Sequence, residues 1–215
     1  MAKVKICGLT STETALAASR AGADFVGFVF TSSRRHVTVE KALGVAQALH
    51  RLSTRPLLVG VFANAPAKEV NLIASSLGLD WVQLSGDEDW QYCREIEYPI
   101  IKVLHIFDDT RIDQVLGEIE KGYHLYGGEE LIHLLDTGRR GTYGGTGETF
   151  SWQLAKEAAN RFPVMVAGGL NPTNVGDLIK EVMPWGVDVS GGVETGGRKD
   201  QAKIEAFVKA VKNVT

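Results

Sequence analysis

Two hydrophobic patterns alternate along the chain. The first is a continuous apolar run of strand length, which occurs eight times, at residues 4–9, 25–30, 57–62, 81–85, 100–106, 131–137, 164–169 and 186–190. Such runs are typical of parallel strands that are buried on both faces. The second pattern repeats apolar residues at i, i+3, i+4 and i+7, at residues 39–46, 70–77, 112–119, 175–182 and 204–211. This spacing predicts helices with one buried face.

The alternation of these two patterns predicts an α/β fold. Eight strand-helix units within 215 residues match a single-domain (β/α)8 TIM barrel that spans residues 1–215. A doubly wound open sheet also alternates, but it usually has fewer strands. Gly-x-Asp introduces three of the runs, at Gly22, Gly78 and Gly186. It predicts helices that end on a glycine before the next strand begins.

Composition and charge exclude several classes of protein. The chain is 44% hydrophobic and 23% charged, with a net charge of −3, which argues against broad nucleic-acid binding. No apolar stretch reaches the roughly 18 residues of a membrane span, and no apolar signal core follows the first Met, so we expect a cytoplasmic protein without membrane contact. Cys7 and Cys93 lack a CxxC spacing, and the five histidines lack a metal-binding spacing. Neither a disulfide framework nor a metal site is therefore predicted.

Glycine is in excess, with 24 residues among 215. In a (β/α)8 barrel, functional groups lie at the C-terminal ends of the strands, and the loops after strands seven and eight commonly bind phosphate. Gly168 and Gly169 fall at the first of these ends, and Ser190 and Gly191 at the second. Glycines at these two ends allow a phosphate to approach the backbone N–H groups closely, so the sequence predicts a phosphate site here. Close packing is the alternative explanation. The glycine-rich loop at residues 138–147 is predicted to be a mobile lid over the barrel mouth.

Two residues at strand ends are candidates for acid-base chemistry. Cys7 ends the first strand and Asp136 the sixth, on either side of the barrel mouth. A thiol acts as a base only as the thiolate, which nearby positive charge favours. An inert buried cysteine and a carboxylate that caps a turn are the alternatives. Arg34 and Arg35 either grip a ligand carboxylate or are solvated surface charges.

The motifs at the strand ends closely resemble those of phosphoribosylanthranilate isomerase of tryptophan biosynthesis. The resemblance runs essentially from end to end and omits only the fifth strand. It is carried by KICGLT (5–10), GFVF (27–30), SRRHV (33–37), VGVF (59–62), VQL (82–84), LDT (135–137), YGGTG (143–147), FSW (150–152), AGGLNP (167–172) with NV (174–175), GVDVS (186–190) and GVE (192–194).

This resemblance implies an aldose-ketose isomerase that carries out the Amadori rearrangement of N-(5-phosphoribosyl)anthranilate. It implies that Cys7 is the general base, that Asp136 is the general acid and that Arg35 binds the substrate carboxylate. No cofactor or metal is implied, and the expected partner is a small phosphorylated molecule, with the protein either a monomer or a homodimer. The remaining predicted substrate-binding residues are Gln83, Gly168, Gly169, Ser190 and Gly191.

Two positions depart from the family pattern. Ser85 stands where most members carry His in Val-Gln-Leu-His-Gly, and Gly191 stands where Ser-Ser-Gly is common. The first departure removes a potential contact near the anthranilate or ribose, and the second removes a hydroxyl from the phosphate site. Asp188 fits the family but is interpreted as structural. Two other functions stay open, a catalytically silent phosphosugar-binding barrel and the histidine-pathway isomerase, although the latter carries Asp where this chain has Cys7.

Overall fold

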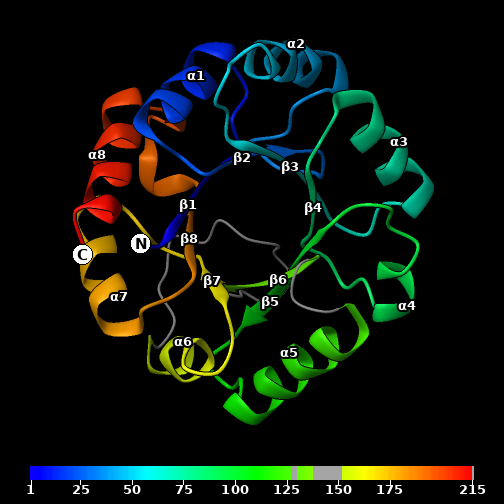
Figure 1. Ribbon diagram of the computed structural model, residues 1–215, viewed down its shortest axis with the longest axis vertical. Coiled ribbons are helices and arrows are strands. Elements are labelled where there is room, and N and C mark those ends of the chain that lie inside the picture. The colour runs from blue at the N-terminus through cyan, green and yellow to red at the C-terminus, as the bar shows by residue number, and fades with distance from the viewer. Residues whose placement is uncertain (127–129, 138–151, 215) are drawn as a thin grey trace.

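The eight apolar runs form a closed barrel of parallel strands (Figure 1). The computed structural model describes residues 1–126, 130–137 and 152–214. Each strand pairs with the next, and the last pairs with the first, so the ring has no open edge. The closure confirms the predicted (β/α)8 fold. The strands are β1 (Lys3–Cys7), β2 (Phe25–Val29), β3 (Leu57–Phe62), β4 (Trp81–Leu84), β5 (Ile100–Ile106), β6 (Leu131–Thr137), β7 (Val164–Val166) and β8 (Gly186–Val189).

The helices form an outer ring around the strands in Figure 1. Each of the five periodic segments lies in a helix, and their buried residues face the barrel. None of the described helices is both long and apolar enough to cross a membrane. The helices are α1 (Thr12–Ala21), α2 (Val39–His50), α3 (Ala67–Leu77), α4 (Trp90–Cys93), α5 (Ile112–Tyr126), α6 (Trp152–Ala159), α7 (Val175–Val182) and α8 (Gln201–Lys212).

Two of the predicted boundaries are wrong for identifiable reasons. The run at 164–169 yields a strand that ends at Val166, because Gly168 and Gly169 have φ of +91° and +63° and leave the extended conformation. Gly22 and Gly78 do end helices in the left-handed conformation, as predicted. Gly186 does not, because it begins β8, and Met183 is the left-handed residue after α7.

A small hairpin after β8 was not predicted. A single 3-10 turn (Gly191–Val193) leads into β9 (Glu194–Thr195), which pairs antiparallel with β10 (Arg198–Lys199). Gly196 and Gly197 between them both have positive φ, as the tight two-residue turn of a hairpin requires. The hairpin returns the chain to the barrel mouth.

Strand register determines which side chains meet inside the barrel. Paired residues in neighbouring parallel strands lie side by side on the same face. Lys5 pairs with Asp188 across β1 and β8, and His105 pairs with Asp136 across β5 and β6. A buried apolar layer that includes Val103 and Leu134 lies two residues earlier along these strands. The polar residues therefore form the layer above it, at the C-terminal end of the barrel.

Candidate active site

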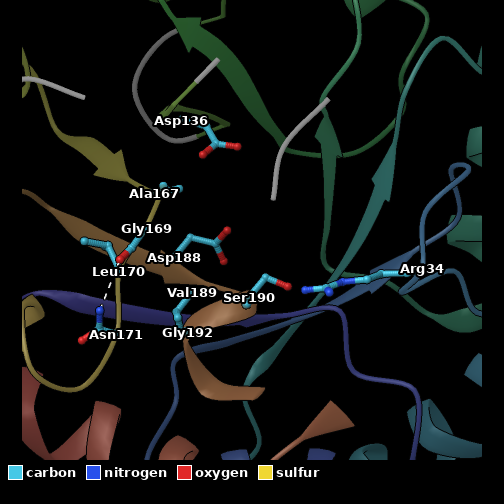
Figure 2. Close-up of a pocket in the computed structure, with 12 residues that line it drawn as sticks. Arg34, Asp136, Ala167, Gly169, Leu170, Asn171, Asp188, Val189, Ser190 and Gly192 are labelled. Atoms are coloured by element: carbon cyan, nitrogen blue, oxygen red, sulfur yellow. Dashed lines mark hydrogen bonds between the residues drawn. The ribbon is translucent and has the colours of Figure 1, made fainter. Parts of the chain in front are cut away.

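Two adjoining cavities open at the C-terminal end of the barrel. The larger, of about 490 Å³, lies over the ends of β7 and β8. The smaller, of about 110 Å³, lies over β1 to β6 and is lined by Cys7 and Gln83, among others. Both are lined by Asp136, Asp188 and Ser190. Figure 2 shows Asp136 and Asp188 projecting into the space of the larger cavity, while Arg34 points toward Ser190.

A buried lysine stands beside Cys7. Lys5 lies two residues earlier in β1, and its Nζ atom donates a hydrogen bond to Oδ1 of Asp188 at 2.9 Å. Burial opposes the charge of Lys5, but Asp188 and Cys7 hold its pKa above the ordinary value, so the residue is a cation. Gly27 of β2 leaves room for this arrangement, because a Cβ atom there would lie 3.0 Å from Sγ of Cys7 and 3.4 Å from Nζ of Lys5.

The electrostatic environment of Cys7 contains opposing effects. Burial raises the pKa of the Cys7 thiol, and the charge of Asp188 raises it further. Lys5 lowers the pKa of the thiol through its charge and its hydrogen bond, and the positive charge of Lys199 lowers it as well. The pKa remains above the ordinary thiol value, so the unliganded site holds the thiol. Positive charge on a bound ligand would shift the balance toward the thiolate.

Asp136 has the protonation behaviour of a general acid. Burial and the nearby charge of Asp188 raise its pKa to about 7, against smaller opposing contributions from the Thr137 backbone and Lys5. A carboxyl group with such a pKa carries a proton for much of the time at neutral pH and can donate it. A carboxylate that merely caps a turn would instead keep a low pKa.

The loops after β7 and β8 form the floor of the larger cavity. A Cβ atom on Gly168 would clash with Oγ1 of Thr137, and one on Gly192 would clash with the carbonyl oxygen of Leu170. Close packing therefore requires glycine at both positions, whatever the ligand. A Cβ atom on Gly191 would meet no backbone atom within 4 Å, and the nearest atom is Nη2 of Arg35 at 3.1 Å. At the predicted phosphate site, close packing thus explains Gly168 and Gly192, whereas Gly191 faces only arginine side chains.

Three cations surround one buried carboxylate at the edge of the site. Glu194 accepts hydrogen bonds from Nε of Arg35 at 2.6 Å, Nη2 of Arg34 at 2.9 Å and Nζ of Lys199 at 3.1 Å. Burial alone would raise its pKa, but Arg35 and Lys199 hold that pKa below the ordinary value. Lys199 also donates to the carbonyl oxygen of Ser190 at 2.7 Å. The cluster retains a positive excess with which to attract an anion.

The two arginines differ in exposure. The Arg35 side chain is 11% exposed and lines the smaller cavity, whereas the Arg34 side chain is 61% exposed and lines the larger one. The hydrogen bond from Nε to Glu194 also fixes the Arg35 guanidinium in one orientation. Between the two predicted possibilities, the geometry favours Arg35 as the residue that meets a ligand in the smaller cavity.

Polar residues from β4 and β5 form the wall across from these arginines. Nε2 of Gln83 donates to Oγ of Ser85 at 3.0 Å. Nε2 of His105 lies 3.0 Å from the carbonyl oxygen of Ser85. The departure from the family pattern at Ser85 thus lies in the site, next to a histidine that the sequence motifs omit.

Lys5, His105 and Lys199 are site residues to which the sequence analysis assigned no role. Strand alternation could have indicated the first two, because Lys5 and Cys7 share one face of β1, and His105 continues the inward face that includes Val103 in β5. Lys199 reaches the site only through the β9–β10 hairpin, which its Gly196-Gly197 turn could have indicated. The predicted lid at 138–147 lies outside the described residues. Among the residues that the structure describes, no group of three or more His, Cys, Asp or Glu side chains could hold a metal ion.

Comparison with known proteins gives one consistent result. A family model described as N-(5'-phosphoribosyl)anthranilate (PRA) isomerase matches residues 4–210. The chain is 51% identical over 213 residues to the N-(5'-phosphoribosyl)anthranilate isomerase of Dehalococcoides mccartyi, with 99% of this chain and 97% of the relative covered. It is 43% identical over 214 residues to the enzyme of the same name from Geobacter metallireducens, with 99% and 100% covered.

Solved structures agree with the sequence relatives. The phosphoribosyl anthranilate isomerase of Thermotoga maritima superposes with a TM-score of 0.82 at 37% identity, over 99% of both chains. Another structure of a phosphoribosyl anthranilate isomerase, in complex with reduced 1-(o-carboxyphenylamino)-1-deoxyribulose 5-phosphate, gives a TM-score of 0.79 at 35% identity, also over 99% of both chains. The chain therefore belongs to the N-(5'-phosphoribosyl)anthranilate isomerase family.

Proposed function

We propose that this protein isomerises N-(5-phosphoribosyl)anthranilate to 1-(2-carboxyphenylamino)-1-deoxyribulose 5-phosphate, a step of tryptophan biosynthesis. The observation that carries the proposal is the joint placement of Cys7 and Asp136 on one cavity, with the pKa of Asp136 raised to about 7. An Amadori rearrangement needs an acid that protonates the ring oxygen and a base that removes a carbon-bound proton, and these two groups supply that pair.

In the first step Asp136 donates its proton to the furanose ring oxygen. The bond between that oxygen and C1 breaks as the lone pair of the anilino nitrogen forms a C1=N double bond. The ring oxygen becomes the C4 hydroxyl, and the nitrogen carries the positive charge of an iminium ion. Burial beside Asp188 keeps a proton available on Asp136 near neutral pH, because it raises the pKa of that carboxyl group to about 7.

In the second step the Cys7 thiolate removes the proton from C2. The electron pair of the C2–H bond forms a C1=C2 double bond and neutralises the iminium nitrogen, which yields an enolamine. The enolamine then loses its C2 hydroxyl proton and gains a proton at C1, which gives the ketone product. The iminium charge acidifies the C2 proton and, together with Lys5 and Lys199, favours the thiolate despite the burial of Cys7.

The two ends of the substrate fit the two cavities. We place the phosphate in the larger cavity, at Gly168, Gly169, Ser190 and Gly191, where backbone N–H groups can meet its oxygens. The aryl carboxylate then extends into the smaller cavity toward Arg35, whose fork geometry suits a carboxylate. Between the two lie Cys7 and Asp136, next to the reacting carbons.

We further propose that the enzyme works in the cytoplasm, where its biosynthetic substrate would be made, and that it is either a monomer or a homodimer. A phosphoribosylanthranilate isomerase from Thermotoga maritima is described as dimeric in a solved structure of its monomeric variants, with a TM-score of 0.79 to this chain. Light scattering coupled to size-exclusion chromatography of the full chain distinguishes the two states.

Turnover of two substrates tests the proposed activity. We expect the purified protein to convert N-(5-phosphoribosyl)anthranilate and to rescue growth of a tryptophan auxotroph that lacks this isomerase. The histidine-pathway precursor, which carries two phosphates, serves as the alternative substrate. Turnover of that precursor alone would overturn the assignment, and ligand binding without any turnover would instead identify a silent phosphosugar-binding barrel.

A further inference from the structure

The smaller cavity has the character of a site for an aromatic ring. Cys7, Val29 and Val61 form a buried apolar cluster of their own, separate from the main core, and all three line this cavity. Their side chains belong to β1, β2 and β3, on the inner face of the barrel. An aryl ring against Val29 and Val61 would be shielded from water, which is where apolar surface is most stable.

His105 forms part of the opposite wall. It lies near the end of β5, pairs in register with Asp136 of β6, and lines the same cavity as Val29 and Val61. Because strand residues that pair in register share a face, the imidazole and the Asp136 side chain lie on the same inner face of the barrel. No other histidine among the described residues lines either of the two cavities at the barrel mouth.

The imidazole is held in one orientation. Its Nε2 atom lies 3.0 Å from the carbonyl oxygen of Ser85, and since a carbonyl oxygen can only accept, Nε2 donates this bond. The bond anchors the ring to β4, beside the Gln83–Ser85 hydrogen bond. A ring that is anchored in advance loses little conformational entropy when a ligand packs against it.

We propose that His105 is a substrate-binding residue that packs against the aryl ring of phosphoribosylanthranilate, on the side of the smaller cavity that faces Val29 and Val61. This inference rests on the proposed function and adds a specificity residue to it. The bond from Nε2 to the Ser85 carbonyl holds the ring in place, so that it presents a fixed wall to the ligand. Its removal should therefore weaken binding of the aryl half and leave the chemical step nearly intact.

Steady-state kinetics of the full chain give the first test. We expect His105→Ala to raise the KM for phosphoribosylanthranilate by about fivefold to tenfold, the order of one aromatic contact, with kcat within about threefold of wild type. His105→Phe keeps a ring against the ligand and should recover most of the KM. His124→Ala, on the exposed face of α5, is the matched control. An unchanged KM in His105→Ala, or a fall in kcat alone, would overturn the proposal.

Binding of two fragments separates an aryl contact from a general loss of structure. We expect His105→Ala to weaken the binding of anthranilate, measured by the fluorescence of anthranilate itself. The affinity for ribose 5-phosphate, measured by calorimetry, should be unchanged. Equal weakening of both fragments would show that the histidine only maintains the barrel mouth. These titrations do not depend on turnover. A wild type that binds anthranilate without turnover contradicts the proposed function, whereas an active wild type with unaltered His105→Ala binding contradicts only this inference.

Discussion

Nζ of Lys5 donates a hydrogen bond to Oδ1 of Asp188 at 2.9 Å, and both side chains are buried in the mouth of the barrel. The two charges of this ion pair have opposite effects on the pKa of each proposed catalytic group. Lys5 favours the thiolate of Cys7 and the carboxylate of Asp136, whereas Asp188 favours their protonated forms. Asp188 therefore has a larger part in the site than the purely structural one that the sequence suggested.

Removal of one partner of this pair should cost both stability and activity. In Lys5→Met the charge of Asp188 stays buried without its partner, which typically destabilises a protein by about 3–5 kcal/mol. The same change removes the positive charge beside Cys7, so we expect kcat to fall by at least about tenfold. Denaturant unfolding and steady-state kinetics measure the two effects.

The double variant Lys5→Met/Asp188→Leu separates the two effects. Replacement of a buried ion pair by apolar residues of similar volume is often neutral for stability. The free energy of unfolding should therefore return toward the wild-type value. Turnover should stay low, because the charge near Cys7 is still absent. Recovery of turnover together with stability would show that Lys5 serves the reaction only by neutralising the charge of Asp188.

Asp136 should lower the stability of the protein at neutral pH. Its pKa is about 7 in the folded protein and 3.8 ordinarily, so the folded state binds the proton more tightly, and stability falls as pH rises from about 4 to 7. Asp136→Asn should therefore be more stable than wild type at pH 8, by up to about 4 kcal/mol. Urea unfolding at pH 8 and pH 4 checks this, and the difference should vanish at the lower pH. A variant less stable than wild type at pH 8 would contradict the raised pKa.

Arg35 and Arg34 offer a matched pair of variants. Both donate to Glu194, but only the buried Arg35 lines the smaller cavity. We expect Arg35→Ala to raise KM by roughly tenfold or more with little change in kcat, as the loss of a charge-assisted contact would. Arg34→Ala should raise KM much less. Equal effects of the two variants would mean that the arginines act only through their common bond to Glu194.

His133 should make the protein sensitive to acid. It is fully buried between β6 and the aromatic rings of Trp90 and Tyr123, and neither ring nitrogen has a hydrogen-bond partner among the described residues. Burial, together with the charge of Lys102, lowers its pKa to about 4 from 6.5. The unfolded chain then binds the proton more readily, so stability falls as pH drops from 6.5 to 4.

His133→Leu tests this contribution, because it removes the titrating group and keeps an apolar side chain in the core. Relative to the variant, the wild-type free energy of unfolding should fall by up to about 3 kcal/mol between pH 7 and pH 4. Unfolding free energies measured across that range give the difference, in which all other groups cancel. Parallel curves for the two proteins would show that His133 does not titrate.

Sequence patterning predicted the barrel well because burial on both faces of a parallel strand leaves a continuous apolar run. Three of the eight runs, at 57–62, 100–106 and 131–137, match their strands at both ends. Helix α1 has no strong apolar periodicity in the sequence, because its buried residues are the small side chains Ala15, Ala17 and Ala18. The strand at 186–190 was predicted, but the helix end assigned to Gly186 was wrong, because Gly186 begins β8 and Met183 is the left-handed residue after α7.

The site was less predictable than the fold because part of it depends on contacts between distant segments. Cys7 and Asp136 could be found as strand ends, and both line one cavity. The role of Lys5 depends on the register of β1 with β8, which lies 183 residues away. The pKa of Asp136 depends on burial and on the charge of Asp188, neither of which a linear motif contains.

Turnover of phosphoribosylanthranilate by wild type, Cys7→Ala and Asp136→Asn tests the proposed acid-base pair most directly. Loss of anthranilate-type fluorescence on conversion can be followed at pH 7.5 with all three proteins shown to be folded. We expect active wild type and a fall in kcat of at least about 10²-fold in each variant, the usual order for a lost general acid or base. Near-wild-type kcat in either folded variant would contradict the role assigned to that residue.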